Sequence, residues 1–331
     1  MESLQQERVV VRKRILLFIL LGWVFLLIGD RVDELRLYQG VNLAMYTIGL
    51  ASIVLLTGYS GQISLGNGAL MAVGAYSAAL SLNNLKFPVW STFIVAVIVS
   101  ALFGMILGYA AARLAGPYLA GTTLALAVGL PAIANQFSIF GGEQGISFNI
   151  GMPPARLGAD FLLYKWLYWL AALMALIALF ITANILDSRF GRTWRAIRGN
   201  ALAAELSGVN AGRSKVLAFS VSAGLAGLAG AVLAMATSLV SPGSFSLSLS
   251  FALVTGAVLA GISSLPGVML GAVILVAIPE IADVVAHRLG DSERATTHLP
   301  GLIVSVLLIL SVIFTPNGPG ENLRKHRKKH A

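Results

Sequence analysis

Residues capable of acid–base, metal or nucleophilic chemistry are few in this sequence and widely separated. The chain has no cysteine, and its four histidines, His287, His298, His326 and His330, are scattered over its C-terminal part. Without thiolates or closely spaced histidines, neither a disulfide nor a zinc site of the usual kind is expected. We therefore expect no metal, no cofactor and no bond chemistry from this chain.

A glycine-rich stretch with polar side chains is better suited to guiding a solute. Glycines recur between Gly58 and Gly74, and Gln62, Ser64 and Asn67 stand among them. Glycine interrupts a helix and leaves backbone amides and carbonyls free, which lipid does not tolerate but a protein-lined or watery pathway does. Tight helix packing is the alternative. We assign to a translocation pathway or gate the residues Gly58, Gly61, Gln62, Ser64, Gly66 and Asn67.

A second candidate segment is the basic stretch 187–215. Arg192, Arg195 and Arg198 follow one another at intervals of three, and Gly199-Asn200 predicts a turn between two short helices. The second helix, over 201–207, should end at Gly208. Small residues such as alanine allow a partner's backbone to approach closely, so this segment suits a groove on another protein. A merely charged, solvated loop is the competing interpretation.

Two acids occur late in an apolar run. Glu280 and Asp283 follow Pro279, and acids inside a membrane are functional candidates by default. This run, however, is approaching the outer surface at that point. We therefore favour solvation at the membrane interface over a role in binding a substrate or moving a proton.

The elements that must position these residues are hydrophobic helices. Hydrophobic residues make up 57% of the 331 positions, charged residues only 11%, and the mean hydropathy is +0.84. Soluble domains carry about 25% charged residues, so lipid must solvate much of this surface. We expect an all-α, polytopic membrane bundle of about ten transmembrane or re-entrant helices, forming one domain over 1–331. The apolar runs lie near 15–29, 37–57, 64–82, 88–112, 119–138, 164–186, 216–239, 250–266, 267–286 and 299–315.

Charge sets the expected orientation. With ten crossings, sixteen of the 23 lysines and arginines fall on one side of the membrane. That side also holds both termini, the segment 187–215 and the basic tail 316–331. The positive-inside rule makes that side cytoplasmic and places the loop 139–163 outside. The net charge of +9 then reflects contact with membrane lipid rather than with nucleic acid. The first run reads as an uncleaved helix, not a signal peptide.

Three motifs, found in order along the chain, resemble one transporter family. Ala203-Ala204-x-x-x-Gly208 looks like the EAA-x-x-x-G loop of ABC importer permeases, with Leu202 where many have glutamate. The longer run from Phe190 to Gly230 is similar to the branched-chain amino-acid permease family, and within it to the M-type subunit. The stretch beginning at Gly58 and the outer Gly141-Gly142-x-x-Gly145-Ile146 extend the resemblance. Departures are Gly199, where an acidic residue is frequent, and 261–267, which replaces a more glycine-rich stretch.

The resemblance implies an ATP-driven importer of the bacterial inner membrane. The chain has no G-x-x-x-x-G-K-[ST] phosphate loop, so ATP would be hydrolysed on a partner. The implied partners are a homologous permease subunit, two ATP-binding subunits and a periplasmic substrate-binding protein, and the implied substrates are branched-chain or related amino acids. A urea, amide or aromatic-acid permease, and a self-sufficient secondary transporter or channel, remain alternatives. The residues that the resemblance assigns to ATPase coupling are Gly191, Arg192, Arg198, Ala203, Ala204 and Gly208.

Overall fold

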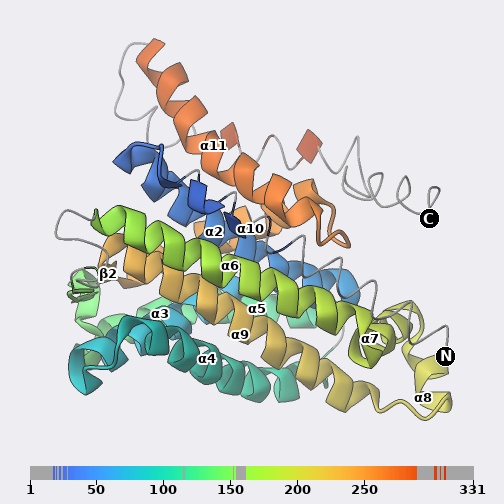
Figure 1. Cartoon of the computed structure of the whole chain (residues 1–331). Coiled ribbons are helices and arrows are strands. Elements are labelled where there is room, and N and C mark those ends of the chain that lie inside the picture. The colour runs from blue at the N-terminus through green and yellow to red at the C-terminus, as the bar shows by residue number, and fades with distance from the viewer. Residues whose placement is uncertain are drawn as a thin grey trace, which may run out of the picture.

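Long helices, packed side by side, make up nearly all of the part of the chain that the computed structural model describes (Figure 1). That part comprises residues 29–114, 116–151, 153 and 162–288, with separate positions between 18 and 27 and between 302 and 310. The predicted first and last spans are described only in part, and the basic tail lies outside the described residues. The helices are α2 (Glu34–Ile53), α3 (Asn67–Leu85), α4 (Val89–Ala111), α5 (Pro117–Gln136), α6 (Leu163–Asp187), α7 (Arg189–Gly199), α8 (Ala201–Leu206), α9 (Ala211–Thr237), α10 (Leu247–Ala260) and α11 (Gly267–Arg288).

The predicted all-α membrane bundle is confirmed, but the predicted number of about ten transmembrane or re-entrant helices was only approximate. Among the described residues, six helical segments are long and apolar enough to cross a membrane, and α11 contributes a shorter apolar stretch, Gly267–Ala282. The predicted span near 64–82 is not among the six. The six segments are Glu34–Tyr59, Val89–Ala111, Tyr118–Gln136, Leu163–Asp187, Ala211–Thr237 and Pro242–Ala260.

Helix α3 tolerates a lower hydropathy because other helices surround it. It packs mainly against α9 and α4, and also against α5 and α10. Its polar Asn67 and Ser81 are buried by protein rather than by lipid. Small residues make this packing possible, since Gly74 lies against the backbone of Gly227, and Gly230 lies against the backbone of Met71. The small residues Gly227 and Gly230 of α9 therefore form a helix interface.

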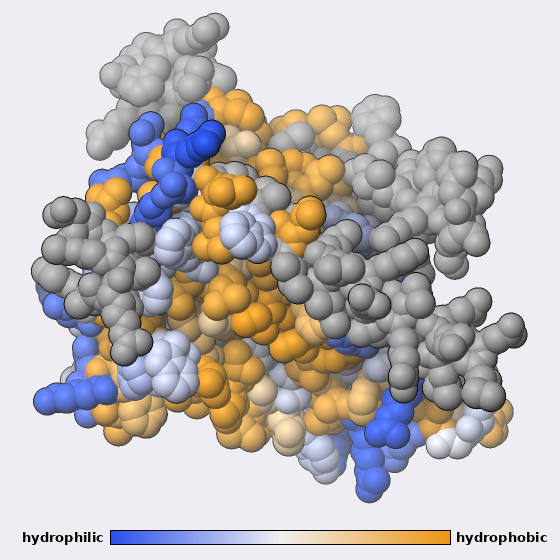
Figure 2. All heavy atoms as spheres, in the orientation of Figure 1, coloured by the Kyte–Doolittle hydropathy of each residue, from blue (hydrophilic) through white to orange (hydrophobic). Residues whose placement is uncertain are grey.

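The outer faces of the bundle are apolar. Ile94, Ile98, Leu102 and Ile106, four residues apart along α4, are all more than half exposed. Side chains at this spacing share one face of a helix, and such a face suits the acyl chains of a bilayer. Figure 2 shows hydrophobic side chains across the middle of the visible surface, with hydrophilic ones gathered towards its ends.

The two ends of the bundle carry different structures. At one end, strand β1 (Ile146–Ser147) pairs antiparallel with β2 (Leu239–Val240), beside the 3₁₀ turn η5 (Pro242–Phe245). Helices α7 and α8 lie at the other end, which we call the α7–α8 end (Figure 1). Helix α6 joins the two ends through 25 residues, or about 37 Å. The segment 139–163 ends at one end of α6 and the segment 187–215 begins at the other, as the topology prediction requires.

Glu280 is partly exposed and pairs with the start of α2. Its side chain is 46% exposed and accepts hydrogen bonds from Arg36 and Gln39 at the start of α2. Nearby, the Lys165 ammonium is 2.5 Å from the Asp30 carboxylate and holds the pKa of that carboxyl below its ordinary value. Exposed polar pairs of this kind are typical of helix ends at a membrane surface. The side chain of Asp283 lies outside the described residues.

Candidate functional site

The glycine-rich stretch is a break between two helices. Helix α2 continues into a π-helix, η1 (Val54–Tyr59), and the chain returns to helix only at Asn67. π-Helical turns are rare in proteins, and those that occur are often found at functional sites. Within the break, Gly61 has φ = +73°, a left-handed conformation that residues with a Cβ seldom adopt. Residues 58–66, from the last turn of η1 to the start of α3, therefore form a fixed, irregular segment, which we call the break.

The polar groups of the break form hydrogen bonds within the chain. Gln62 is buried, and its Nε2 donates to the Ser60 hydroxyl at 2.7 Å and to the Lys215 carbonyl at 3.1 Å. The Leu65 amide donates to the Thr123 hydroxyl at 3.0 Å. These bonds tie the break to the start of α9 and to α5. Buried polar groups are costly unless they are paired, so the bonds stabilise this irregular shape.

A second polar cluster lies just inside α3. Asn67 Nδ2 donates to the Ser52 hydroxyl at 2.7 Å, and the Ser222 hydroxyl donates to the Ser52 carbonyl at 3.0 Å. The Gly68 amide donates to the Ser250 hydroxyl at 3.1 Å. Four helices thus meet through buried polar groups. Sequence reasoning missed Ser52, Ser222 and Ser250, although each is a polar residue in an apolar run.

The structure changes the role expected of Gln62, Ser64 and Asn67. We expected them to line a pathway, but all three side chains are buried within the chain. The exposed positions of the break are Gly61 and Ile63. In this structure the trio therefore supports the shape of the break and of the start of α3, and it lines no open surface.

Gly58 and Gly66 occupy positions of close backbone approach. A Cβ on Gly58 would overlap the Ile262 carbonyl, in the turn between α10 and α11. A Cβ on Gly66 would lie 2.7 Å from the Thr123 carbonyl of α5. Larger residues at either position would push the break away from its neighbours.

The segment 187–215 folds as the sequence predicts. Three polar residues cap successive helices: the Ser188 hydroxyl accepts from the Phe190 amide, the Asn200 side chain from Ala203, and the Asn210 side chain from Arg213. Such residues are strongly preferred at helix N-termini. Helix α7 ends at Gly199 and α8 at Leu206. Gly208, with φ = +85°, ends the unit in the left-handed conformation typical of helix C-termini.

One face of this segment packs on the bundle. Trp194 is buried, and its indole Nε1 donates to the Ser214 carbonyl at 3.0 Å. Ile197 of α7, Ala204 of α8 and Ala211 of α9 form a small hydrophobic cluster. We expected Ala204 to face the groove of another protein, but only 6% of it is exposed. The sequence could not show which face of a six-residue helix turns inward.

The opposite face of α8 is apolar and free. Leu202 is 67% exposed and Leu206 is 83% exposed, and these residues are four positions apart on one face. Ala203 and Gly208 beside them are also exposed. We call Leu202, Ala203 and Leu206 the outward face of α8. The sequence analysis named neither leucine as a coupling residue, because Leu202 was interpreted only as a replacement for glutamate in the loop motif.

The arginines of α7 contact their own chain. Arg192 Nη1 donates to the Asp187 carbonyl at 3.1 Å, and Arg195 Nε donates to the Gly191 carbonyl at 3.2 Å. Gly191 is buried, and a Cβ there would overlap the Leu186 carbonyl. We expected Arg192 to meet groups of a partner, but its described hydrogen bond lies within the segment.

Arg198 connects the two candidate segments. Its Nη1 donates to the Gly58 carbonyl and, at 2.8 Å, to the Ser263 hydroxyl. The assignment to ATPase coupling led us to expect acidic or carbonyl groups of another protein as partners of Arg198. The carbonyl lies 140 residues earlier in the same chain, a contact that spacing cannot reveal. The break and the α7–α8 segment therefore form one site.

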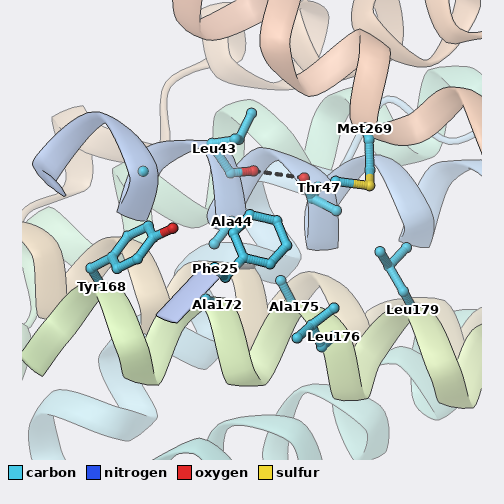
Figure 3. A pocket seen from close by; sticks show the side chains of 11 residues that line it. Phe25, Leu43, Ala44, Thr47, Tyr168, Ala172, Ala175, Leu176, Leu179 and Met269 are labelled. Carbon is cyan, nitrogen blue, oxygen red and sulfur yellow. Dashed lines mark hydrogen bonds between the residues drawn. The ribbon is translucent and has the colours of Figure 1, made fainter. Parts of the chain in front are cut away.

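An apolar pocket between α2 and α6 is a poor candidate for binding a charged solute. Figure 3 shows Leu43, Thr47, Tyr168 and Met269 around it, with Phe25. The Thr47 hydroxyl donates to the Leu43 carbonyl at 2.7 Å, within its own helix. Among the residues that line it, only Thr47 and Tyr168 have polar side chains. This pocket offers no charge to hold an amino acid.

The part of the chain that contains the break and the capped helix pair matches a known protein family. Residues 37–312 match the family model described as branched-chain amino acid transport system, permease component. The chain belongs to this permease family. It is thus a multi-pass inner-membrane protein and a permease subunit of an ABC importer.

Individual relatives agree with this assignment. The permease protein LivM of Salmonella typhimurium is 30% identical over 326 residues, covering 92% of this chain and 73% of LivM. LivH of the same organism is 27% identical, covering 86% of this chain and 94% of LivH. The ribose import permease protein RbsC of Haemophilus influenzae is 25% identical over 74% of this chain and 75% of RbsC. The resemblance to the M-type permease is thereby confirmed.

Gly61→Val is expected to impair transport more than insertion of the permease. The new side chain would need a left-handed backbone, and its Cβ would lie 3.0 Å from Arg198 Cγ, so a β-branched residue would strain the break and displace Arg198. Uptake and the amount of chain in the membrane should be measured together. Gly199→Val is the control, because a Cβ there meets nothing within 4 Å. Equal uptake by both variants would show that Gly61 has no such role.

Proposed function

We propose that this permease imports branched-chain or related aliphatic amino acids. It would work with a homologous permease chain, two ATP-binding subunits and a periplasmic substrate-binding protein. The observation that carries the proposal is the outward face of α8, which is apolar, exposed, and built on a helix pair bonded to the break. An exposed pair of leucines on a short, capped helix suits a groove on a partner. The names of the LivM and LivH relatives, high-affinity branched-chain amino acid transport permeases, support the substrate class.

The proposed mechanism is alternating access. Closure of the paired ATP-binding subunits would move α7 and α8, and the break would follow because Arg198 and Gln62 join it to this unit. A ligand or partner shifts a conformational equilibrium only as far as it prefers one state. ATP binding on the partners would supply that preference, and this chain would make or break no covalent bond.

Other substrates fit the same scaffold. The ribose import relative is named for a sugar, so related permeases are not restricted to one solute. A urea, amide or aromatic-acid importer is therefore the nearest alternative, since a separate binding protein would select the ligand. A self-sufficient transporter or channel is a weaker alternative, because ionisable residues are scarce in the spans and the outward face of α8 would have no use.

Copurification tests this proposal. A tagged chain, expressed with the other subunits of its system, should retain an ATP-binding subunit and a second permease after detergent extraction. The associated binding protein should then be screened by calorimetry against leucine, isoleucine, valine, urea and phenylalanine. Binding of the aliphatic amino acids supports the proposed substrate class. Binding of urea or phenylalanine alone would replace it, and failure to retain an ATP-binding subunit would contradict the importer assignment.

Cysteine labelling tests the orientation. We expect both termini and the α7–α8 end to face the cytoplasm and the loop 139–163 to face the periplasm, because positive residues favour the cytoplasmic side. The chain has no native cysteine, so single cysteines report without background. An impermeant maleimide added to intact spheroplasts should label Glu143→Cys but not Ser207→Cys or Lys325→Cys. The reverse labelling pattern would show that the chain has the opposite orientation in the membrane.

A further inference from the structure

Three segments distant in sequence meet at the guanidinium of Arg198. They are the end of η1, the turn between α10 and α11, and helix α7. Arg198 Nη1 donates to the Gly58 carbonyl and to the Ser263 hydroxyl, and the Ser263 hydroxyl in turn lies 3.3 Å from the Gly58 carbonyl. We call this group of three residues the Arg198 junction.

The junction has a physical basis in the helix end that it closes. Carbonyls in the last turn of a helix lack intrahelical donors, and the helix dipole favours a cation there. The Arg198 guanidinium meets both needs through a charge-assisted hydrogen bond, which is stronger than a neutral one. Gly58 allows the contact because it brings the backbone against the Ile262 carbonyl with no Cβ between them.

The same helix holds the break at neighbouring points. The aliphatic part of Arg198 lies against Gly61, where a Cβ would be 3.0 Å from Arg198 Cγ. One turn earlier, the Arg195 guanidinium lies 5.7 Å from the centre of the Tyr59 ring, within the range of a cation–π interaction. Helix α7 therefore contacts the break through two arginines and cannot move without acting on it.

On its other side, α7 is part of the unit that bears the outward face of α8. Ile197 and Ala204 pack together with Ala211, so α7, α8 and the start of α9 form one packed unit. A force applied to the outward face reaches Arg198 through this cluster. From Arg198 it reaches both the break and the α10–α11 turn.

We propose that Arg198 is the positioning residue that transmits ATP-driven movement of α7 and α8 to the break and to the α10–α11 turn, with Ser263 as its second contact. This inference rests on the proposed importer function and adds the residue through which coupling occurs. It differs from a capping role alone, because a cap would stabilise the fold without affecting how much substrate is moved per ATP. The coupling ratio, substrate imported per ATP hydrolysed, is therefore the decisive quantity.

The test uses the assembled importer in proteoliposomes. Arg198→Ala, Ser263→Ala and the double variant are compared with the native permease for ATPase association, ATP hydrolysis, uptake and thermal stability. Arg198→Ala should keep the ATP-binding subunit and hydrolyse ATP, while its coupling ratio falls at least about tenfold, the smallest factor that corresponds to losing one hydrogen bond to a charged group. Ser263→Ala should lower the ratio less. The double variant should be no worse than Arg198→Ala, because contacting residues are not additive.

Arg189→Ala is the matched control. It removes an arginine from the same helix, one whose guanidinium lies over Phe190 at 5.0 Å from the ring centre, and its coupling ratio should equal the native one. An unchanged ratio in Arg198→Ala would overturn the proposal, as would parallel losses of hydrolysis and uptake. If Arg198→Ala does not assemble, Ser263→Ala decides, and an unchanged ratio there overturns it. If the native chain itself retains no ATP-binding subunit, the proposed function fails first.

Discussion

Leu206→Glu is expected to release the ATP-binding subunit from the permease and to abolish uptake. Leu206 is 83% exposed on the outward face of α8, so a partner's groove would bury it almost completely. Burying a leucine contributes about 1.5–3 kcal/mol, and an unpaired charge in its place adds a desolvation cost. Together these lower the affinity at least about 100-fold. Subunit copurification and uptake should be measured in the same preparation.

Ala196→Glu is the control for this variant. It puts the same charge on an exposed residue of α7 that is not part of the outward face of α8. It should retain the ATP-binding subunit and most of the uptake. Ala204→Glu is not a suitable test, because its charge would enter the cluster of Ile197 and Ala211 and disturb the segment itself. Normal association of Leu206→Glu would show that the partner docks elsewhere.

Gly74→Leu is expected to prevent stable folding of the permease. Gly74 lies against the backbone of Gly227, and Gly227 lies in turn against Ser100 of α4. No side chain can be accommodated between α3 and α9 unless the two helices separate. Overpacking costs about 1–3 kcal/mol where side chains can adjust, and more is expected here because backbone is in the way. The yield of inserted chain should fall severely, and any purified chain should melt several degrees lower.

Gly129→Leu is the matched control in another span. A Cβ on Gly129 of α5 meets nothing within 4 Å, so the isolated chain should accept the leucine with little change in yield or melting temperature. A melting temperature for Gly74→Leu equal to that of Gly129→Leu would contradict the close approach of α3 and α9.

The sequence predicted those features that depend on local chemistry. Hydropathy located the spans because lipid demands long apolar runs. The turn at Asn200 and the stop at Gly208 were predictable because capping depends on neighbours in the chain. The position of the break was predictable for the same reason, since Gly58 and Gly61 lie within a few residues of the helix that they interrupt.

Features that depend on distant packing were not predictable. The residues around Arg198 in α7 do not indicate that its hydrogen-bond partner is Gly58. Ala204 is buried and Leu206 is exposed because one side of α8 packs on the bundle and the other does not. Residue spacing cannot show which side packs in a helix of six residues. The sequence predicts α3 as a span like the others. Its surroundings, the helices α4, α5, α9 and α10, decide what it contacts, and composition alone does not reveal them.

Uptake by a reconstituted complex tests the importer assignment most directly. The permease, its copurified subunits and the periplasmic binding protein are placed in proteoliposomes, and accumulation of labelled leucine is followed with and without ATP. We predict accumulation only with hydrolysable ATP and the binding protein, and none from this chain alone under an ion gradient. Accumulation by the chain alone, without ATP or an ATP-binding subunit, would contradict the importer assignment.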